Sequence, residues 1–514
     1  MSENDSIKNK TIGGAVWKMC ERSLAQIINF VVSIILARLL LPDAYGIVAL
    51  IMVFITICDK LVSSGFATSL IQKKGADNLD FSTVFYFSIV VAGILYAVLF
   101  FTAPLIAAGY DKYDSDLLIL VTRVIGIRII ISAVNSVQHA FVSKTMQFRR
   151  LFFSTIAGAV VSATVGIIMA YKGYGVWALV WQYLIASIID TVVLWFTVKW
   201  RPMLKFSFAR LKGLYSFGWK IFIASMIRTL YNDLRSIVIG IFYTPADLAY
   251  YNKGNSFPQL VESNVVGTID SVMFPAMAKK QSDAVMRLAI LRRSIKVSSF
   301  VLIPLLVGLA ATAKPVILLL LGPNWSDAII FMQILCFSFV LMPVEQENLQ
   351  AIKAIGRSDV VLKLEIIKKV LGVGLLVAAI KFGVVAIAIS MLLSAIVAAV
   401  VNAIPNRKLL GYGYKKQIGD ILPTLIFSGI MFGCVYPLSF LPINIYLIAV
   451  IQVAVGMTVY VGLSAVFKNE SFIYLWNMAK GIIAKVRKKK AAVAVQSAAN
   501  NEEQGEIADE QEHS

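Results

Sequence analysis

Residues 22–46 read RSLAQIINFVVSIILARLLLPDAYG, and this stretch predicts a membrane span that carries a polar face. It is apolar over a length that crosses a bilayer, for which an α-helix needs about 20 residues. Its polar members, Arg22, Gln26, Asn29 and Ser33, recur at the spacing i, i+4, i+7 and i+11, so they share one helix face. Pro42 ends the helix, because proline has no N–H to donate and restricts the residue before it.

The same design returns near the middle of the chain, in residues 225–249, which read SMIRTLYNDLRSIVIGIFYTPADLA. The second polar stripe consists of Ser225, Thr229, Asn232 and Ser236, and the second terminating proline is Pro245. Asn29 and Asn232 are 203 residues apart, as are Pro42 and Pro245, and as are Asp59 and Glu262. Chance similarity between two membrane helices is the alternative. Matches of asparagine, proline and acidic residues in the same order favour an internal duplication, which is common in transporters.

The composition is that of a polytopic membrane protein. Hydrophobic residues make up 59% of the 514 and charged residues 15%, whereas soluble domains have about 45–50% and about 25%. The net charge of +19 does not indicate a nucleic-acid partner. The basic residues gather in every second predicted loop, which is the pattern of the positive-inside rule in membrane proteins. The four cysteines lie in apolar segments without metal-ligand spacing, and we interpret them as packing residues. The polar start leads directly into a full-length span, which argues against a cleavable signal peptide.

Hydropathy and helix breakers predict about 14 spans in an all-α fold. The expected boundaries are 14–41, 44–71, 82–108, 117–142, 151–171, 175–198, 216–243, 250–277, 294–321, 326–352, 360–380, 383–405, 418–437 and 442–467. The span at 250–277 is the most polar. It is either a helix that faces a wet interior or not a span at all.

The charges of the loops test this count. Basic residues crowd one set of loops: Lys8, Lys10, Lys73, Lys74, Lys144, Arg149, Arg150, Lys199, Arg201, Lys205, Arg210, Lys212, Lys279, Lys280, Arg287, Arg292, Arg293, Lys353, Arg357, Arg407, Lys408, Lys415, Lys416 and the run 485–490. The alternate loops carry only Lys112, Lys172, Lys253 and Lys381 beside several aspartates. The positive-inside rule therefore predicts that both termini are cytoplasmic.

A second correspondence, at an offset of 208 residues, links Gly175-Val176 with Gly383-Val384 and Gln138 with Gln346. Each repeat then holds six spans, and an even number preserves orientation, so the repeats are related by an axis along the membrane normal. The predicted domains are a cytoplasmic N-terminus (1–12), an N-lobe (13–198), a basic linker (199–215), a C-lobe (216–406), two extra spans (407–467), a basic amphipathic segment (468–490) and a disordered acidic tail (491–514).

No known catalytic signature occurs in the chain. It contains two histidines, His139 and His513, and no Walker-type phosphate loop, metal-spaced cluster or nucleophile elbow. We therefore expect no enzyme, no metal and no cofactor beyond a coupling ion, Na⁺ or H⁺. Charged groups at membrane depth usually line a cavity or pair with one another. The candidate substrate-binding residues are Arg22, Asn29, Arg123, Arg128, Asn135, Arg228, Asn232 and Arg235, with His139 on the same helix face as Arg128.

These groups have two interpretations. Their excess of positive charge suits a pyrophosphate-bearing substrate, which arginine binds in a bidentate manner. Alternatively the charges pair internally, for example Arg22 with Asp59, or extend to the membrane interface. Asp59, Glu262 and Asp270 are the candidate ion-coupling groups, because carboxylates at membrane depth carry protons or bind Na⁺.

Several stretches resemble the Wzx-like polysaccharide exporters of the multidrug/oligosaccharidyl-lipid/polysaccharide exporter superfamily. They are residues 11–50, TIGGAVWKMCERSLAQIINFVVSIILARLLLPDAYGIVAL, the following GFATSLIQKK, and TPADLAYYNKGNSFPQLV with MFPAMAKKQ in the second half. The resemblance runs from about Thr11 to Lys468. It implies two V-shaped lobes that alternate between inward- and outward-open states, driven by an ion gradient. The implied activity is the flipping of undecaprenyl-pyrophosphate-linked oligosaccharide repeat units across the bacterial cytoplasmic membrane.

The implied partners are the lipid-linked oligosaccharide, membrane lipids and other polysaccharide-assembly proteins, and no site residue is carried over from the family. Two alternatives stay open. A drug/cation antiporter of the same superfamily needs an acidic cavity, and this one is predicted to be basic. A membrane-embedded polymerase or ligase needs catalytic polar groups and usually a sizeable external loop.

Overall fold

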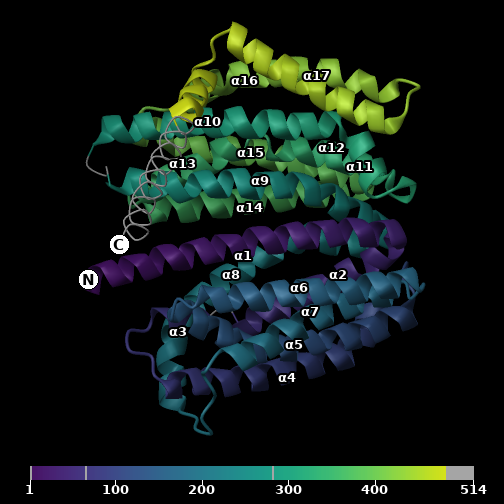
Figure 1. The fold of residues 1–514 in the computed structure, drawn as a ribbon, viewed down its shortest axis with the longest axis vertical. Coiled ribbons are helices and arrows are strands. Elements are labelled where there is room, and N and C mark those ends of the chain that lie inside the picture. The colour runs from purple at the N-terminus through teal and green to yellow at the C-terminus, as the bar shows by residue number, and fades with distance from the viewer. Residues whose placement is uncertain (1–2, 64–65, 280–282, 482–514) are drawn as a thin grey trace, which may run out of the picture. The chain divides into compact units, whose positions relative to one another are not determined.

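The computed structural model describes residues 3–63, 66–279 and 283–481, and this part of the chain is almost entirely helical, with no strand (Figure 1). The first helices are α1 (Glu3–Leu39), α2 (Pro42–Ser63), α3 (Phe66–Gln72), α4 (Asn78–Ala108), α5 (Ser115–Lys144), α6 (Phe148–Tyr171) and α7 (Val176–Thr197). The later ones are α8 (Phe208–Phe242), α9 (Pro245–Lys279), α10 (Ala284–Ala311), α11 (Ala313–Leu320), α12 (Ala328–Phe339), α13 (Met342–Ala354), α14 (Ser358–Ala379), α15 (Val384–Leu410), α16 (Tyr414–Val435) and α17 (Ile445–Val466). Short 3₁₀ turns occupy Pro323–Trp325, Ile380–Phe382 and Tyr436–Phe440, and residues 470–481 are also helical. The predicted acidic tail at 491–514 lies outside the described residues.

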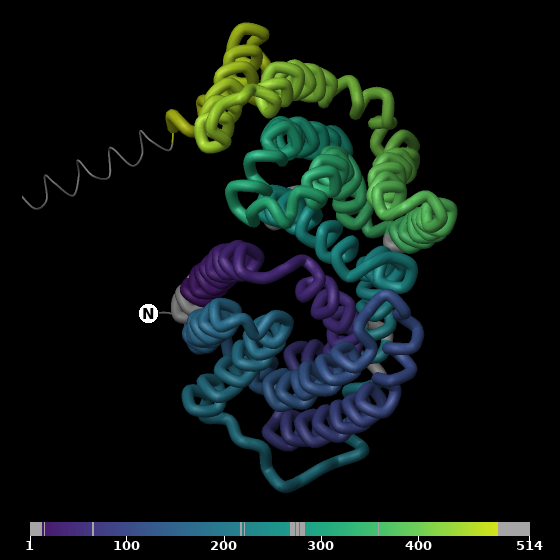
Figure 2. The backbone as a smooth tube through the Cα atoms, turned by 90° about the vertical axis from the view of Figure 1, so that its right-hand side faces the viewer, coloured from purple at the N-terminus to yellow at the C-terminus, as the bar shows by residue number. Residues whose placement is uncertain are grey.

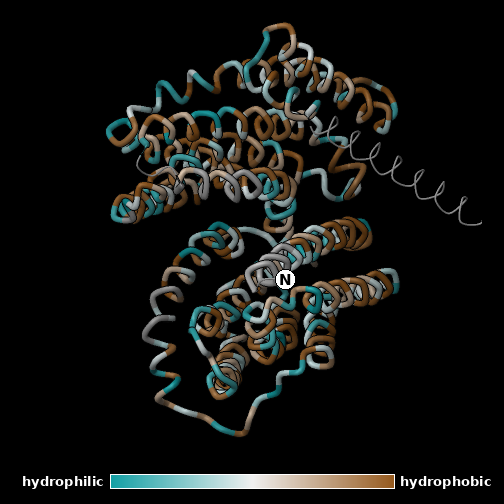
Figure 3. The backbone as a smooth tube through the Cα atoms, turned by 60° about the vertical axis from the view of Figure 1, so that its left-hand side comes forward, coloured by the Kyte–Doolittle hydropathy of each residue, from teal (hydrophilic) through white to brown (hydrophobic). Residues whose placement is uncertain are grey.

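Eleven stretches of the described helices are long and apolar enough to cross a membrane. They are Val16–Leu39, Pro42–Gln72, Asn78–Ala108, Ser115–Lys144, Phe148–Tyr171, Val176–Thr197, Ala284–Ala311, Ala328–Ala354, Val384–Leu410, Tyr414–Phe440 and Ile445–Val466. Figure 3 shows that the helices are hydrophobic over long stretches. The multi-pass membrane fold is therefore confirmed. The three other predicted spans form α8, α9 and α14, which are helical over 35, 35 and 22 residues but too polar to qualify, so the count of 14 stays a prediction.

Internal contacts divide the chain into two compact units. The first unit comprises Met1–Leu260, Ala313–Phe339 and Glu365–Val397, and the second comprises Val261–Thr312, Val340–Leu364 and Ala398–Ser514. In the first unit α4 packs on α5, α6 packs on α7 and on α1, and α2 packs on α5 and α8. In the second unit α10 packs on α13 and α16, and α16 packs on α17.

Helix α4 shows how one element of the first unit meets both lipid and protein. Its exposed face is the apolar stripe Val90, Ile94, Val98, Phe101 and Leu105. These residues follow one another at steps of three or four, so they lie on one side of the helix. A contiguous exposed apolar stripe of this length is unfavourable in water and favourable against acyl chains.

The helix boundaries follow the predicted repeat. Pro42 begins α2 and Pro245 begins α9, and both occupy the first helical position, where the missing N–H is harmless. Gly175 and Gly383 directly precede α7 and α15, and both have positive φ, at 56° and 98°. That backbone region favours glycine, since it has no Cβ. The two halves therefore use the same residue types to start corresponding helices.

The starts of α2 and α9 are in direct contact at Gly46. A Cβ placed on Gly46 would lie 1.9 Å from the carbonyl oxygen of Pro245, which is closer than any non-bonded carbon approaches an oxygen. The neighbouring atoms belong to the backbone and cannot rotate away. Glycine at position 46 is therefore required for this helix contact.

We expect Gly46→Ala to lower the midpoint of thermal unfolding and the yield of folded protein, because the Pro245 backbone has to move. Gly93→Ala in α4 is the matched control, since nothing lies within 4 Å of its Cβ position. Alanine is otherwise the better helix former by about 1 kcal/mol. A Gly46→Ala protein as stable as the Gly93→Ala protein would contradict the close contact.

A buried lysine connects α9 to α1 and α2. The Nζ of Lys253 donates to Ser33 Oγ at 2.5 Å and lies 4.2 Å from the ring centre of Tyr45 and 5.8 Å from that of Trp325. The prediction that placed Lys253 in a loop is wrong, since the residue lies inside α9 and is only 8% exposed. Cation–π contacts and a hydroxyl acceptor offset part of the cost of burying the ammonium.

The basic linker between α7 and α8, an extended loop in Figure 2, is hydrogen-bonded to the start of α4 at several points. Trp200 Nε1 donates to Asn78 Oδ1 at 2.6 Å, and the Met203 N–H donates to Ser82 Oγ at 2.9 Å. Asp80 is fully buried and pairs with Lys73 at 2.6 Å and with Arg210 at 3.5 Å. This carboxylate therefore joins the start of α4 to the start of α8.

Asp77 and Asp80 also form a capping box at the start of α4. The Asp80 N–H donates to Asp77 Oδ1 at 2.9 Å, and this bond lowers the pKa of Asp77 below its usual value. The charged form of the cap is therefore stabilised, and its contribution to stability is lost only as the pH falls through that lowered pKa.

We expect Asp80→Asn to lower the thermal unfolding midpoint, because two basic side chains lose their shared counter-charge. The loss of unfolding free energy should be about 1–3 kcal/mol, since both basic partners remain partly hydrated. Asp111→Asn, in the exposed turn after α4, is the control and should leave the midpoint unchanged. Equal midpoints for the two variants would show that Asp80 does not anchor the linker.

Candidate functional site: a polar cavity in the first unit

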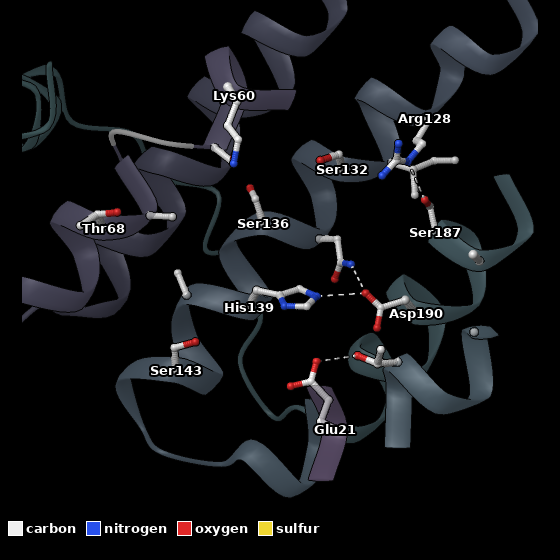
Figure 4. A pocket seen from close by; sticks show the side chains of 18 of the residues that line it. Glu21, Lys60, Thr68, Arg128, Ser132, Ser136, His139, Ser143, Ser187 and Asp190 are labelled. Atoms are coloured by element: carbon white, nitrogen blue, oxygen red, sulfur yellow. Dashed lines mark hydrogen bonds and ion pairs between the residues drawn. The ribbon is translucent and has the colours of Figure 1, made fainter. Parts of the chain in front are cut away.

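The first unit contains an open cavity of about 1040 Å³ that is lined by α1, α2, α3, α5, α6, α7 and α8 (Figure 4). Its polar lining consists of Glu21, Asn29, Lys60, Ser63, Thr68, Arg128, Ser132, Asn135, Ser136, His139, Ser143, Thr155, Ser187, Asp190, Ser225 and Arg228. Small-molecule sites usually have volumes of about 300–1,000 Å³. The cavity is therefore large enough for a bulky polar head group.

One face of α5 supplies the longest polar surface of the cavity. Arg128, Ser132, Asn135, Ser136, His139 and Ser143 all line it. Their spacing repeats every three or four residues, so one helix face carries them all. Ile125, Ile129 and Ala133 of the same helix are buried in the core, so α5 also anchors this polar surface to the packed interior.

Arg128 is held in place by contacts with two neighbouring helices. Its Nε donates to Ser187 Oγ of α7 at 3.2 Å, and its Nη2 lies 3.7 Å from Asp59 Oδ2 of α2. The partner of Asp59 is thus Arg128 and not Arg22, which was the pairing considered from the sequence. A guanidinium fixed in this way keeps donors free for a ligand, because it has five N–H groups.

Asp190 of α7 accepts hydrogen bonds from two residues of α5. Its Oδ2 lies 2.5 Å from Asn135 Nδ2 and 3.0 Å from His139 Nε2. The ring nitrogen Nε2 donates in this arrangement, which leaves Nδ1 as an acceptor when the imidazole is neutral. The Asp190 side chain is 18% exposed and the His139 side chain 39%. The pair is therefore accessible from the cavity while it holds α5 against α7.

Glu21 of α1 reaches the same side of the cavity. Its Oε1 accepts from Thr155 Oγ1 of α6 at 3.4 Å, and its Oε2 pairs with Lys18. Lys18, Glu21, Arg22, Gln26 and Asn29 also line an adjoining hollow of about 440 Å³ along α1. Glu21 and Asn29 belong to both spaces, so the polar face of α1 continues from one to the other.

The charges in the cavity are sorted between two walls. The cationic wall consists of Lys60 on α2 and Arg228 on α8, two helices that pack on each other. The carboxylate wall consists of Glu21 on α1 and Asp190 on α7. Both of these helices pack on α6. Helix α5 lies between the two walls and contributes Arg128 (Figure 4). Arg128 is paired with Asp59 behind the lining, so Lys60 and Arg228 are the lining cations without an ion-pair partner among the described residues.

Several predicted residues lie together here and others do not. Arg128, Asn135, Arg228 and Asn29 line the cavity, and Arg22 lines the adjoining hollow. Arg123 does not line the cavity, since its guanidinium stacks 4.3 Å from the ring centre of Phe100 and donates to a carbonyl of α4.

The remaining candidates on α8 are also outside the lining. Asn232 is exposed. Arg235 is only 8% exposed and donates to Ser394 Oγ of α15 at 3.2 Å. The turn of α8 that carries Arg228 and Ser225 therefore faces the cavity, while Arg235 faces another helix of the first unit.

The three predicted coupling carboxylates are not brought together by any described contact. Asp59 is paired with Arg128. Glu262 belongs to the second unit, where it has partners of its own. Asp270 lies in α9, and its side chain is outside the described residues.

The sequence analysis missed Glu21 and Asp190 and did not assign Lys60 to the cavity. Asp190 had a detectable signal, because it is a single acidic residue within the apolar run 184–196, and such residues are rare and usually functional. Glu21 and Lys60 sit near the ends of their apolar stretches, where charged residues are common, so their sequence signal was weak. The described residues contain no group of three or more His, Cys, Asp or Glu side chains placed to hold a metal ion.

The cavity predicts a pattern of thiol reactivity. In a variant whose four native cysteines are replaced by serine, Ser136→Cys should react rapidly with a hydrophilic maleimide, because it lines the cavity. Ser162→Cys on α6 is the matched control and should react at least about tenfold more slowly, since Ser162 is only 3% exposed. Mass spectrometry of the labelled protein gives both rates. Equal rates would mean that the α5 face is not open to water.

A bundle of membrane-spanning helices around a large polar cavity is the architecture of a multi-pass membrane transporter. Two solved structures share this fold. A lipid II flippase, MurJ, in an inward closed conformation superposes with a TM-score of 0.73 at 13% identity, over 89% of this chain and 99% of that one. An inward-facing multidrug resistance MATE transporter of the MOP superfamily gives 0.60 at 16% identity, over 75% and 94%.

The chain belongs to the polysaccharide biosynthesis protein family, whose model matches residues 35–330. Among curated relatives, the succinoglycan biosynthesis transport protein ExoT of Rhizobium meliloti is 23% identical over 82% of this chain and 83% of its own. The lipopolysaccharide biosynthesis protein WzxC of Escherichia coli is 23% identical over 82% and 88%. The teichuronic acid biosynthesis protein TuaB of Bacillus subtilis is 23% identical over 69% and 73%. The relatives are thus proteins of polysaccharide biosynthesis, and the resemblance to Wzx-like exporters is confirmed.

Proposed function

We propose that this protein is a flippase that moves undecaprenyl-pyrophosphate-linked oligosaccharide repeat units across the bacterial cytoplasmic membrane for the synthesis of a surface polysaccharide. Lipopolysaccharide, capsule and exopolysaccharide are the polymers considered. The observation that carries the proposal is the cavity of about 1040 Å³ with Lys60, Arg128 and Arg228 in its lining. Family membership and the flippase-like fold support the same conclusion.

The cations of the cavity suit a pyrophosphate. Lys60 and Arg228 have no ion-pair partner among the described residues, so their charges are available to a ligand. Charge-assisted hydrogen bonds to phosphate oxygens are about twice as strong as neutral ones. The hydroxyl and amide groups on α5 then meet the sugars, while the lipid chain stays in the bilayer. Rocking of the lobes between inward- and outward-open states carries the head group across, driven by Na⁺ or H⁺.

The arrangement in the membrane is part of the proposal. Helices α8, α9 and α14 each reach the 30 Å of a bilayer core at about 1.5 Å per residue. Counting them as spans with polar faces gives 14 helices and places both termini in the cytoplasm, in agreement with the basic loops. The proposed arrangement keeps the predicted division into an N-lobe (13–198), a linker (199–215), a C-lobe (216–406) and two extra spans (407–467).

The alternatives have less support. A cationic drug would be repelled by Lys60 and Arg228, which line the cavity without an ion-pair partner among the described residues, and this disfavours a drug/cation antiporter. A polymerase or ligase needs activated catalytic groups, and the cavity offers carboxylates that are already hydrogen-bonded to neighbours. Flipping without any change to the head group is the activity that the site supports best.

We expect Arg128→Ala and Arg228→Ala each to lower the transport of lipid-linked oligosaccharide about tenfold or more, because a charge-assisted contact of about 1.5–3 kcal/mol is lost. Arg22→Ala, on the adjoining hollow, should have a smaller effect of the same sign. Surface polysaccharide in a deletion strain that carries each variant, at equal protein level, gives the measurement.

Lys172→Ala, in the exposed turn between α6 and α7, removes the same charge outside the cavity and should leave the polymer unchanged. Arg123→Ala should lower protein stability and not transport per molecule, because Arg123 packs on Phe100. Normal polymer in all three cavity variants would rule out the proposed role of the cavity charges. A change in drug susceptibility with intact polymer would favour the antiporter.

A further inference from the structure

The two walls of the cavity differ in how their charges are balanced, and this difference bears on the sugar part of the substrate. On the cationic wall, Lys60 and Arg228 line the cavity and have no ion-pair partner among the described residues. On the carboxylate wall, Asp190 accepts hydrogen bonds from Asn135 and His139, while Glu21 accepts one from Thr155 and pairs with Lys18 on its own helix. A pyrophosphate therefore finds its partners on one side only.

The carboxylate wall is well supplied with the groups that bind sugar hydroxyls. Carboxylate and amide oxygens accept hydrogen bonds from hydroxyls, and the ring nitrogen Nδ1 of neutral His139 does so as well. Ser132 and Ser136, on the same face of α5, both donate and accept. Figure 4 shows Ser132, Ser136 and His139 along one side of the cavity, with Asp190 facing His139.

Contacts to the pyrophosphate and contacts to the sugar are expected at different positions along α5. Arg128 and His139 are 11 residues apart, which is roughly 16 Å along the helix at about 1.5 Å per residue. The Arg128 guanidinium itself reaches Ser187, one turn of α7 from Asp190, but it is also paired with Asp59 at 3.7 Å. Part of its charge is therefore balanced before a sugar contacts His139 and Asp190.

We propose that the carboxylate wall is a sugar subsite that selects an uncharged sugar next to the pyrophosphate and disfavours a uronic acid. Glu21 and Asp190 place negative charge where the sugar lies, and a carboxylate on the sugar is repelled by them. A neutral hexose keeps its hydroxyl contacts without that repulsion. This inference rests on the proposed function, since it specifies the head group that the same cavity accepts.

The test uses purified full-length protein in proteoliposomes with two synthetic polyprenyl-pyrophosphate substrates. They are identical except that one carries a hexose and the other the corresponding hexuronic acid. Access of the head group to membrane-impermeant periodate gives the initial rate of flipping for each. The wild-type protein should move the hexose lipid at least about threefold faster, the factor produced by one unit charge a few ångströms away in water-like surroundings.

Three variants and one control locate the preference. Glu21→Gln and Asp190→Asn should each bring the ratio of rates toward one, and either suffices if the other fails to fold. Ser136→Lys should reverse the preference, because it adds a cation to the sugar subsite. Asp111→Asn, an exposed acid far from the cavity lining, should keep the wild-type ratio.

The outcomes separate the two proposals. If the wild-type protein flips neither lipid, the proposed function fails. If it flips both at the same rate or prefers the hexuronic acid, only the sugar subsite is overturned. A hexose preference that survives both Glu21→Gln and Asp190→Asn would also overturn it, because the selectivity would then arise elsewhere.

Discussion

The cost of placing a charge at membrane depth is the constraint on which the first unit depends. An ionised side chain among acyl chains is unfavourable by several kcal/mol unless water, a partner or a protein dipole replaces its hydration. The protein meets this constraint in two ways. Some charges are removed from water and paired or stacked, as with Lys253 over Tyr45 and Arg123 over Phe100. Others are gathered around a shared space large enough to hold water, as with Lys60 and Arg228.

The cavity can exist because the outside of the same helices is apolar. Helix α4 presents an unbroken hydrophobic stripe to its surroundings, while α5 turns its serines, Asn135 and His139 inward. Hydrogen bonds from α5 to Asp190 of α7 and from α6 to Glu21 of α1 connect the helices around the hollow. These bonds stabilise the walls without filling the space between them, so open volume and rigidity are compatible.

Sequence reasoning predicted the helical membrane fold, the family and the helix ends before Pro42 and Pro245, because proline positions and apolar length are local signals. It did not predict that the same prolines begin the next helices. It also predicted that Arg128, Asn135 and Arg228 would share a space. It could not tell Arg123 from Arg128, since both lie in α5 and only the neighbouring helices decide which one faces Phe100. It overlooked Asp190, whose position in an apolar run was a visible signal, but the pairing of that residue with His139 and Asn135, 51 and 55 positions away, was not predictable. Pairings between distant segments leave little trace in a single sequence.

The contact between Arg235 and Ser394 has a consequence for how the chain is made. The two residues are separated by 159 positions, and synthesis adds about 5–20 residues per second. Arg235 is therefore synthesised roughly 8–32 s before its acceptor exists. Helices form in microseconds or less, so α8 is complete long before then. During that interval the ribosome-bound intermediate has to keep Arg235 hydrated or paired with some other acceptor, and its first unit becomes complete only when α15 arrives.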